Sequence, residues 1–429
     1  MKVLVIGGGV IGTTTAWCLR QDGHDVTVLD RADALAAEGS FANGGMLHAS
    51  HTEPWNSPAA IRQLIRWIGR ENSPLLLRPS QLPNLAGWGM GFLRYSRPRH
   101  HRRSTRINTR LARYSQRMMQ LIREQTGIRY DEAQRGIIKI FRSRRELDEA
   151  ALVAQLTAEL GVRHQILDVS ATIALEPALS GIRKELVGAI YYPDDESGDA
   201  CLFTRRLGEI AVRQGVRLEL RTAVQRLELK RGAIHRVVTS RGMHQADCYV
   251  LAAGVDAPLL AKPIGLHLPI RPVKGYSASL PVAGCPGVPL VPIIDEQHKV
   301  VMTQLGERLR IAGTAEFAGY DYSIRESRVR AIVEQALTNL PQLAGNVDRN
   351  AASRWACLRP LTVDGPPILG RTSVPNLFLN VGSGHLGWTF AAGCAQVLAD
   401  ILGGRPSAID LDGLTLARFG CRGLIERHN

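Results

Sequence analysis

The sequence lacks any run of about 18 uninterrupted apolar residues, so no membrane-spanning helix is predicted. Cysteine is scarce: the seven residues are an odd number and form no CxxC pair, which argues against a disulfide framework or a metal site and favours reduced thiols in a cytoplasmic setting. Acidic residues are outnumbered, since 39 Asp and Glu stand against 53 Lys and Arg. The net charge of +14 predicts an acidic partner, which would be a nucleic acid, an anionic membrane surface or an anionic small molecule.

The rest of the composition is that of a soluble, folded chain. Apolar residues make up 45% of the 429 residues and charged residues 21%, so most of the chain is expected to bury a core. The length suits two or three domains. The opening MKVLVIGGGVIG has an apolar run too short for a signal sequence, and we interpret it as a buried strand.

The first thirty residues have the pattern of a strand, a helix and a second strand. Residues 3–6 are continuously apolar, as in a strand buried on both faces. A helix is expected from about residue 10 to residue 21, and its positive N-terminal end can face a phosphate. The second strand, residues 26–29, ends at Asp30.

Three glycines between the first strand and the helix match the fingerprint GxGxxG. Gly7 permits the tight turn, Gly9 lets a pyrophosphate approach the backbone, and Gly12 lets the helix pack close to the strand. Asp30 stands where a carboxylate can bind a ribose 2′-hydroxyl. The pattern predicts a dinucleotide site without choosing between a nicotinamide and a flavin.

A second glycine-rich turn follows the Asp30 strand. It is too polar for a core element, and the backbone amides of such a turn can line an extended anionic cofactor, although an ordinary surface loop would have the same composition. Its candidate cofactor residues are Ser40, Asn43, Gly44, Gly45 and Met46.

Several motifs together resemble the D-amino-acid oxidase superfamily of FAD-dependent enzymes. They are the N-terminal unit, SFANGG, GLHLPIRPVKGYS, LRPLTVDGPPILGR and GSGHLGWT. The resemblance runs nearly the full length of the chain and is greatest to the small-subunit family of bacterial D-amino-acid dehydrogenases. It implies noncovalent FAD, oxidation of a D-amino acid to its imino acid, and electrons passed to the respiratory chain rather than to NAD.

The resemblance also implies a fold of the α/β class. A Rossmann-type FAD-binding domain, discontinuous in sequence, is expected from residues 1–50, 190–267 and 351–429. An α+β substrate-binding domain with an antiparallel sheet is expected from residues 51–189 and 268–350. The FAD contacts that these turns and the resemblance predict are Gly7, Gly9, Val10, Ile11, Gly12, Asp30, Arg31, Ser40, Asn43, Gly44, Gly45, Met46, Val224, Ala253, Gly254, Gly384, His385, Leu386, Gly387, Trp388 and Thr389.

The segment NVGSGHLGWTF, residues 380–390, is a second strand–glycine–helix unit. It lacks a following strand with a terminal acid, so we interpret it as the other end of the FAD clamp rather than as a second dinucleotide site. Gly384 and Gly387 would allow close approach, and Leu386 and Trp388 would pack around the flavin. The start of the helix at Thr389 would stabilise the anionic reduced ring.

Arg359 is the predicted substrate-carboxylate ligand, because it matches the arginine of the superfamily's RP motif and because a planar guanidinium suits a carboxylate. Tyr276 is predicted as a second substrate contact or pocket wall, and Lys274 as a residue near the flavin or the substrate. His385 is the third catalytic candidate, although deprotonation of an amine can be left to solvent. The order of Ser383 and His385 departs from the related dehydrogenases, which puts the substrate preference in doubt.

Residues 94–117 carry nine arginines and no acid, and apolar residues recur at helical spacing. A similar amphipathic helical face is expected at residues 61–68. Trp88 and Phe92, which lie between these two segments in the sequence, are expected on the surface. Basic amphipathic helices with aromatic residues suit an anionic bilayer, so a peripheral site on the inner face of the inner membrane, with delivery of electrons to a quinone, is one interpretation. A solvated helix face packed on the substrate domain is the other. Nucleic-acid binding is disfavoured, because few aromatic residues interrupt the run.

Other functions remain open from the residues alone. Related enzymes of the same class would act on D-hydroxyproline, glycine, sarcosine or an opine. A tRNA-modification flavoprotein is an alternative of another class, since the net charge would suit RNA, and an NAD-dependent dehydrogenase is a third.

Overall fold

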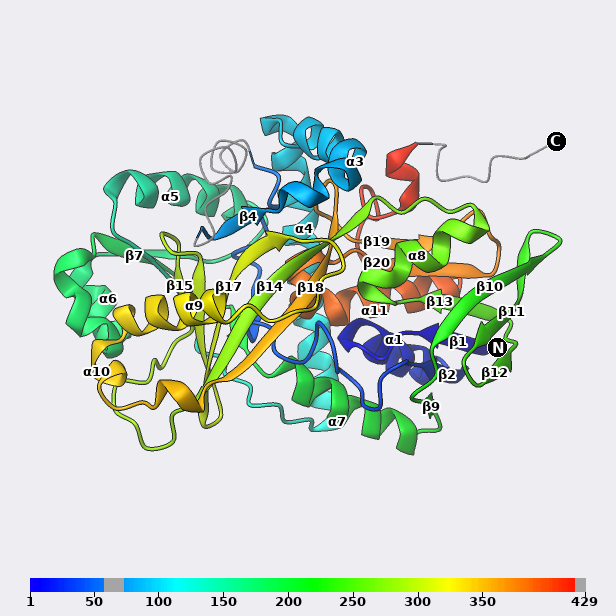
Figure 1. The fold of residues 1–429 in the computed structure, drawn as a ribbon, viewed down its shortest axis with the longest axis horizontal. Helices are drawn as coiled ribbons and strands as arrows, with labels where there is room; N and C mark the ends of the chain where they lie inside the picture. Colours follow the sequence, from blue (N-terminus) through cyan, green and yellow to red (C-terminus); the bar gives the residue numbers. More distant parts are fainter. Residues whose placement is uncertain (58–72, 421–429) are drawn as a thin grey trace.

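The computed structural model describes residues 1–57 and 73–420. Two large sheets lie side by side in Figure 1, a six-stranded sheet with its helices on the right and a nine-stranded sheet on the left. The predicted helical face at residues 61–68 lies outside the described residues.

The six-stranded sheet has the order β19-β20-β13-β1-β2-β9. All neighbours pair in parallel except β19, which is antiparallel to β20. The carboxyl ends of β1, β2, β13 and β20 therefore meet at one edge, where ligands of open α/β sheets bind. The strands are β1 (Lys2–Ile6), β2 (Asp25–Leu29), β9 (Arg217–Glu219), β13 (Cys248–Leu251), β19 (Ile368–Arg371) and β20 (Leu377–Val381).

Helices cover one face of this sheet and a small sheet covers the other. The helices are α1 (Val10–Gln21), α7 (Ala200–Arg213) and α11 (Gly387–Leu402), and α1 packs against both of the others. The small antiparallel sheet consists of β10 (Val224–Lys230), β11 (Ala233–Thr239) and β12 (Gly242–His244), with α8 (Ala257–Ala261) beside it. The parallel strands are thus buried on both faces, which explains their continuous apolar runs.

The nine-stranded sheet has the order β18-β14-β17-β16-β15-β5-β7-β6, with β4 paired to β17. Its pairs are antiparallel except β15 with β5 and β17 with β4. The strands are β4 (Leu75–Leu77), β5 (Ile137–Phe141), β6 (Gln165–Leu167), β7 (Gly188–Tyr192), β14 (Ile270–Pro281), β15 (Ile293–Asp295), β16 (Val300–Leu305), β17 (Arg308–Phe317) and β18 (Ser353–Thr362). The predicted fold class is confirmed, with a second sheet that is mixed rather than purely antiparallel.

The remaining elements surround the nine-stranded sheet or join the two sheets. A buried apolar cluster forms where α9 packs on β14, β16 and β17. The elements are α3 (Leu82–Tyr95), α4 (Pro98–Thr126), α5 (Arg144–Ala158), α6 (Val169–Leu175), α9 (Glu326–Asn339), α10 (Pro341–Ala344), β3 (Met46–Leu47) and β8 (Glu196–Ser197).

The pairing of β14 with β18 brings two distant segments together along ten residue pairs. From the end of β18 the chain passes to β19, so it enters the six-stranded sheet again only at Ile368. The domain boundaries predicted from the sequence remain a prediction, because sheet membership alone does not define a domain.

The arginine-rich segment forms α4, whose apolar face is buried within the protein. Ile107, Leu111 and Tyr114 are almost fully buried, and α4 packs against α11. Ion pairs occupy several arginines of the opposite face: Arg103 with Asp412, Arg106 with Glu159, Arg110 with Asp410 and Arg113 with Asp194. The structure therefore favours the packed-helix interpretation for α4, because its apolar face is not available to a membrane.

The prediction that Trp88 and Phe92 are exposed is wrong. Phe92 is only 7% exposed, Trp88 stacks on it with ring centroids 5.1 Å apart, and the indole N–H of Trp88 donates to the carbonyl oxygen of Pro269 (3.1 Å). Both rings anchor α3 to the protein. The exposed apolar residues of α3 are instead Leu82, Met90 and Leu93.

Candidate active site

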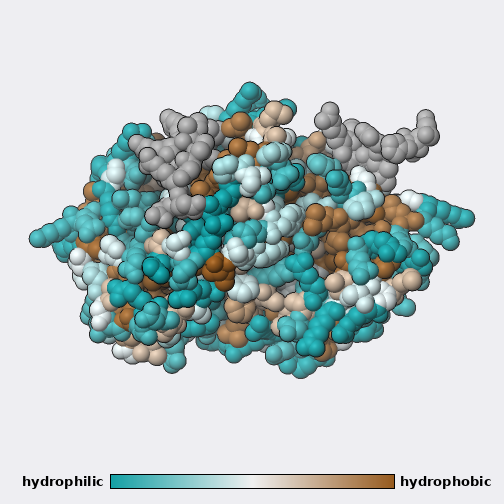
Figure 2. Space-filling model, viewed as in Figure 1, coloured by the Kyte–Doolittle hydropathy of each residue, from teal (hydrophilic) through white to brown (hydrophobic). Residues whose placement is uncertain are grey.

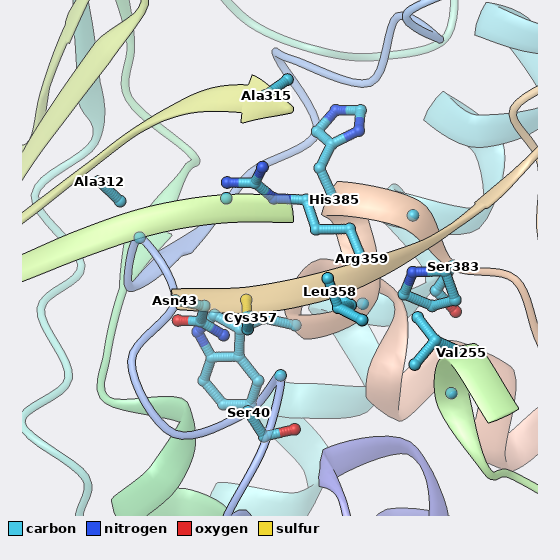
Figure 3. Close-up of a pocket in the computed structure, with 18 of the residues that line it drawn as sticks. Ser40, Asn43, Val255, Ala312, Ala315, Cys357, Leu358, Arg359, Ser383 and His385 are labelled. Carbon is cyan, nitrogen blue, oxygen red and sulfur yellow. The ribbon is translucent and has the colours of Figure 1, made fainter. Parts of the chain in front are cut away.

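One cavity of about 1150 Å³ lies where the two large sheets meet. It extends from the glycine turn after β1, past β14 and β18, to the turn between β15 and β16. In Figure 3, Ser40, Asn43, Val255 and Ser383 lie on one side of β18, and the His385 ring and the Arg359 guanidinium lie on the other. The volume exceeds that of an ordinary small-molecule pocket, which is about 300–1000 Å³.

The first glycine turn has the geometry that its sequence predicts. Gly7 has φ of +115°, and a side chain there would overlap the carbonyl of Ala252. A side chain at Gly12 would overlap the carbonyl oxygen of Gly7, so this glycine sets the close packing of α1 on β1. Gly7, Gly9, Val10 and Ile11 line the cavity, whereas Gly12 does not. Gly12 thus acts on the site through packing.

Asp30 lies at the carboxyl end of β2 and lines the cavity. Its carboxylate accepts hydrogen bonds from the backbone N–H groups of Gly8 (2.5 Å) and Ala32 (2.8 Å), which orient it beside the glycine turn. Arg31 also lines the cavity but is paired with Glu38 and with Asp256 (2.8 Å).

The second glycine turn also lines the cavity, at Ser40, Asn43, Gly44, Gly45 and Met46. The hydroxyl of Ser40 accepts from the backbone N–H of Val10 (3.0 Å), which ties this turn to the first turn of α1. The guanidinium of Arg310 donates to the carbonyl oxygen of Asn43 (2.8 Å). The turn therefore bridges the two large sheets, which an ordinary surface loop would not do. Val224, Ala253 and Gly254 also line the cavity.

The C-terminal glycine loop enters the cavity from the other side. Gly384 has φ of +56°, and Gly384, His385, Gly387 and Trp388 line the cavity. Helix α11 begins at Gly387, two residues before the predicted start. Leu386 and Thr389 do not line the cavity: Leu386 packs in a hydrophobic cluster, and the Thr389 hydroxyl accepts from the backbone N–H of His48 (3.3 Å).

Arg359 reaches into the cavity from β18 and carries its positive charge without an acidic partner. Among the described residues no Asp or Glu forms an ion pair with it, whereas Arg31, the other arginine that lines the cavity, is paired. Its guanidinium donates to the carbonyl oxygen of Thr314 (3.0 Å) and lies 5.4 Å from the ring centroid of Trp55. Burial lowers the pKa of Arg359, because the surroundings disfavour the cation.

Gly275 on β14 makes room for the guanidinium. A Cβ atom at Gly275 would lie less than 3.0 Å from Cζ and both terminal nitrogens of Arg359, although the backbone of Gly275 is not in the left-handed region. The glycine of the KGY motif therefore determines where the cation of the RP motif can lie. Sequence reasoning missed this pairing, since β14 and β18 are adjacent only in the folded protein.

The other two residues of the KGY motif contact acidic side chains. The hydroxyl of Tyr276 donates to Oε2 of Glu316 (2.7 Å), and burial, followed by this hydrogen bond, raises the pKa of the phenol. Tyr276 lines the cavity, so it forms pocket wall with its hydroxyl already occupied. Lys274 is fully buried, pairs with Asp321 (3.0 Å) and does not line the cavity.

His385 belongs to a group of aromatic rings at the far end of the cavity. It stacks on Trp55 with ring centroids 5.0 Å apart, and its ring lies 6.2 Å from that of His51, which in turn lies 5.8 Å from that of His48. Each histidine has one buried ring nitrogen to which no described residue forms a hydrogen bond. Burial lowers the pKa of His48 and of His385 to about 3, so both are neutral at pH 7.

Charged side chains complete this end of the cavity. Lys139 on β5 is 4% exposed, donates to the carbonyl oxygen of Ser50 (3.1 Å) and lies 4.0 Å from Glu296. Glu296 pairs with Lys299 (2.7 Å), and the neighbouring cations hold the pKa of Glu296 well below its usual value. Burial raises the pKa of Asp195, which lies near Lys139, to about 6.

Sequence reasoning missed most of the residues at this end: His51, Glu53, Trp55, Lys139 and Glu296. Trp55 had a signal, since it lies in the PWNSP segment that contributes to the family resemblance. The sequence signal for Lys139 was weaker, because it is a single lysine within the apolar strand IIKIF.

Comparison with known proteins identifies the chain's relatives. The family model described as DAO, FAD dependent oxidoreductase, matches residues 2–401. A D-amino acid dehydrogenase of Paramagnetospirillum magneticum is 45% identical over 420 residues, which is 98% of this chain and 99% of that protein. A D-amino acid dehydrogenase of Xanthobacter autotrophicus is 41% identical over the same shares.

Solved structures share the fold at lower identity. A glycine oxidase of Geobacillus kaustophilus superposes with a TM-score of 0.75 at 23% identity, over 97% of this chain and 98% of that one. An L-proline dehydrogenase of P. horikoshii superposes with a TM-score of 0.77 at 18% identity, over 99% and 98%. These likenesses extend over both sheets.

Proposed function

Because the chain belongs to the DAO family of FAD-dependent oxidoreductases, we propose that it oxidises D-amino acids to imino acids, which water then converts to 2-oxo acids and ammonia. The observation that carries the proposal is the unpaired guanidinium of Arg359 in the cavity that the glycine turns line. The names of the relatives at 45% and 41% identity support the choice of D-amino acids over other amines.

The residues present fit FAD. The two glycines Gly7 and Gly9 leave room for a pyrophosphate at the N-terminal end of α1, and the first turn of that helix contains no acidic residue to repel it. At the other end of the cavity, the buried hydroxyl of Ser383 has no hydrogen-bond partner within the described part of the chain. We assign the pyrophosphate to the first turn, a ribose to Asp30, and the flavin to the side of the cavity near Gly384 and α11.

FAD supplies the hydride acceptor when it is bound, so the protein's own residues need to bind and orient the substrate. Arg359 is suited to hold the substrate carboxylate, because a guanidinium can donate two parallel hydrogen bonds to one carboxylate. Binding of the anion would also compensate the charge of a cation that the fold buries without a partner.

His385 is proposed to orient the substrate amine. It is not proposed as the base that takes up the proton of that amine. Its low pKa leaves the imidazole neutral at pH 7, with one buried nitrogen free of other partners. A neutral imidazole can accept a hydrogen bond from the amine of the substrate. The Arg359 cation disfavours protonation of His385, which is consistent with release of the amine proton to solvent.

Substrate profiling with an artificial electron acceptor tests the proposal. The purified flavoprotein is assayed with D-amino acids, their L-enantiomers, glycine, sarcosine and D-hydroxyproline. Turnover of primary D-amino acids with release of ammonia is expected. Turnover of secondary amines alone would contradict it, and so would salt-sensitive tRNA binding without turnover of any free amino acid.

The electron acceptor and the place of the enzyme in the cell are finer proposals. We propose a quinone as the acceptor and peripheral binding at an anionic membrane. Within the described part of the chain, every helix is too short or too polar to span a bilayer. Support for a surface site comes from α3, where Leu82, Met90 and Leu93 are 53–71% exposed and Arg94 is exposed beside them. Figure 2 shows hydrophobic side chains over α3 at the top of the view.

Vesicle binding tests the α3 surface. Met90→Ser is expected to weaken sedimentation with anionic vesicles several-fold, because apolar contact and charge act together at such surfaces. Leu152→Ser is the matched control, since Leu152 is 67% exposed on a different helix, α5. Equal binding by both variants and the parent protein would contradict the membrane proposal.

A turnover assay of the isolated chain tests whether a partner subunit is required.

A further inference from the structure

The cavity beyond Trp55 contains a carboxylate that the oxidation of an amino acid does not require. Glu53 lines the cavity, and its buried Oε2 atom has no hydrogen-bond partner among the described residues. Its nearest ion-pairing group is Nδ1 of His51, at 3.8 Å. A buried carboxylate oxygen without a partner costs free energy, so its retention points to a ligand that supplies the partner.

The described residues around Glu53 leave its charge uncompensated at short range. No described lysine or arginine lies within 4.0 Å of it; Lys139 and Lys299 pair with Glu296, and Lys139 interacts with Glu53 only at longer range. The described groups that face Glu53 are His51, His101 and, at longer range, the Tyr192 hydroxyl and the Lys139 ammonium. Burial lowers the pKa of both histidines, so they stay neutral at pH 7 and supply no cation.

The path from Arg359 to Glu53 has an aromatic middle and a polar end. The guanidinium lies over Trp55, Trp55 stacks on His385, and the His385 ring lies next to that of His51. In Figure 3 the side chains of Arg359 and His385 reach into the same part of the cavity. A substrate held by its carboxylate at Arg359 can therefore lay an aliphatic stem along the Trp55 ring, with its end directed at Glu53.

We propose that Glu53 is a specificity-determining residue that binds the cationic end of a basic side chain, so that D-lysine, D-ornithine and D-arginine are favoured substrates. Long basic side chains combine an apolar stem with a charged end, which matches the order of groups along this wall. A short or wholly apolar side chain would leave Oε2 of Glu53 unpaired, which a polar pocket discriminates against. The inference rests on the proposed function, because it assumes a substrate held at Arg359.

The test compares D-lysine with D-norleucine, which has the same carbon chain without the ammonium group. The holoenzyme is assayed with a dye acceptor at pH 7, and D-glutamine and D-glutamate are included. D-lysine is expected to exceed D-norleucine in kcat/KM by about tenfold or more, as for a hydrogen bond to a charged group. Glu53→Gln is expected to bring this ratio close to one, because the variant keeps the shape and loses the charge.

Glu149→Gln is the matched control, since Glu149 lies at the outer rim of the cavity, is exposed and pairs with Arg145 (2.9 Å). Its D-lysine to D-norleucine ratio should equal that of the parent. Preference for D-norleucine, D-glutamine or D-glutamate over D-lysine would overturn the inference and leave the proposed function standing. An unchanged ratio of D-lysine to D-norleucine kcat/KM in Glu53→Gln would do the same. Failure to oxidise any D-amino acid would overturn both.

Discussion

Replacing Gly275 by alanine tests whether the carboxylate site depends on the fit between two neighbouring strands. The added Cβ atom would lie less than 3.0 Å from three atoms of the Arg359 guanidinium, so the guanidinium must move. The backbone of Gly275 lies outside the left-handed region and can accept alanine. The expected effect is therefore a displaced Arg359 in a folded protein.

The magnitude follows from the hydrogen bonds that the displaced guanidinium would lose. Hydrogen bonds to charged groups contribute about 1.5–3 kcal/mol each. Loss of one such bond from a bidentate pair lowers kcat/KM by about 10- to 100-fold, at 1.4 kcal/mol for each factor of ten. Most of the loss should be a rise in KM, because the carboxylate is held before and during the reaction.

The assay combines turnover with a direct binding measurement. Steady-state kinetics with a D-amino acid gives kcat and KM, and the change in flavin absorption on titration with propionate, a carboxylate without an amine, reports anion binding alone. Gly345→Ala is the control, since Gly345 is exposed and a Cβ atom there would meet nothing closer than 3.9 Å.

A double-mutant cycle with Arg359→Gln gives the sharpest refutation. If Gly275→Ala acts through the guanidinium, it should add little to the loss caused by Arg359→Gln. Full additivity of the two losses, or unchanged propionate binding in Gly275→Ala, would refute the reasoning.

Three further predictions concern the cofactor and the buried acid. Gly12→Ala should lower the flavin-to-protein absorbance ratio and destabilise the protein by about 1–3 kcal/mol, because the methyl group would overlap the carbonyl oxygen of Gly7. Full flavin content with an unchanged Tm would contradict this. Gly384→Leu should lower flavin occupancy more than it raises KM, because φ is +56° there and the loop faces the cavity; a raised KM at full occupancy would count against it. Burial raises the pKa of Asp195 to about 6, so the folded protein binds this proton more tightly than the unfolded chain and gains stability as the pH falls from 6 to 4. Asp195→Asn should remove up to about 3 kcal/mol of this gain in the free energy of unfolding, as measured by urea unfolding at pH 4 and pH 7. If the unfolding free energies of the variant and the parent protein depend on pH identically, Asp195 does not titrate in this range.

Much of the cofactor side of the cavity could be predicted from the sequence. The turn at Gly7, the acid at Asp30 and the loop at Gly384 each have local causes, because a positive φ, a strand end or a helix start is encoded within a few residues. Arg359 was predicted from a motif, and the structure places it in the cavity. Its role as carboxylate ligand remains a prediction.

The opposite end of the cavity could not be predicted, since its residues come from separate parts of the chain. Glu53 and Trp55 follow β3, Lys139 lies on β5, and Glu296 follows β15. No spacing in the sequence relates these segments. They meet because β5 pairs with β15 in the nine-stranded sheet and because that sheet adjoins the glycine loops.

The sequence by itself determined the class of fold, the glycine turns and Arg359 as a candidate, because these depend on local backbone conformation and on motifs of a few residues. Only the tertiary structure decided that the apolar face of α4 is buried against α11, that the Tyr276 hydroxyl is occupied by Glu316, and that Oε2 of Glu53 is buried beside the cavity without a hydrogen bond from any described residue. Burial and pairing are properties of the assembled chain. They depend on which distant residues the sheets bring into contact, and a single sequence does not contain that information in local form.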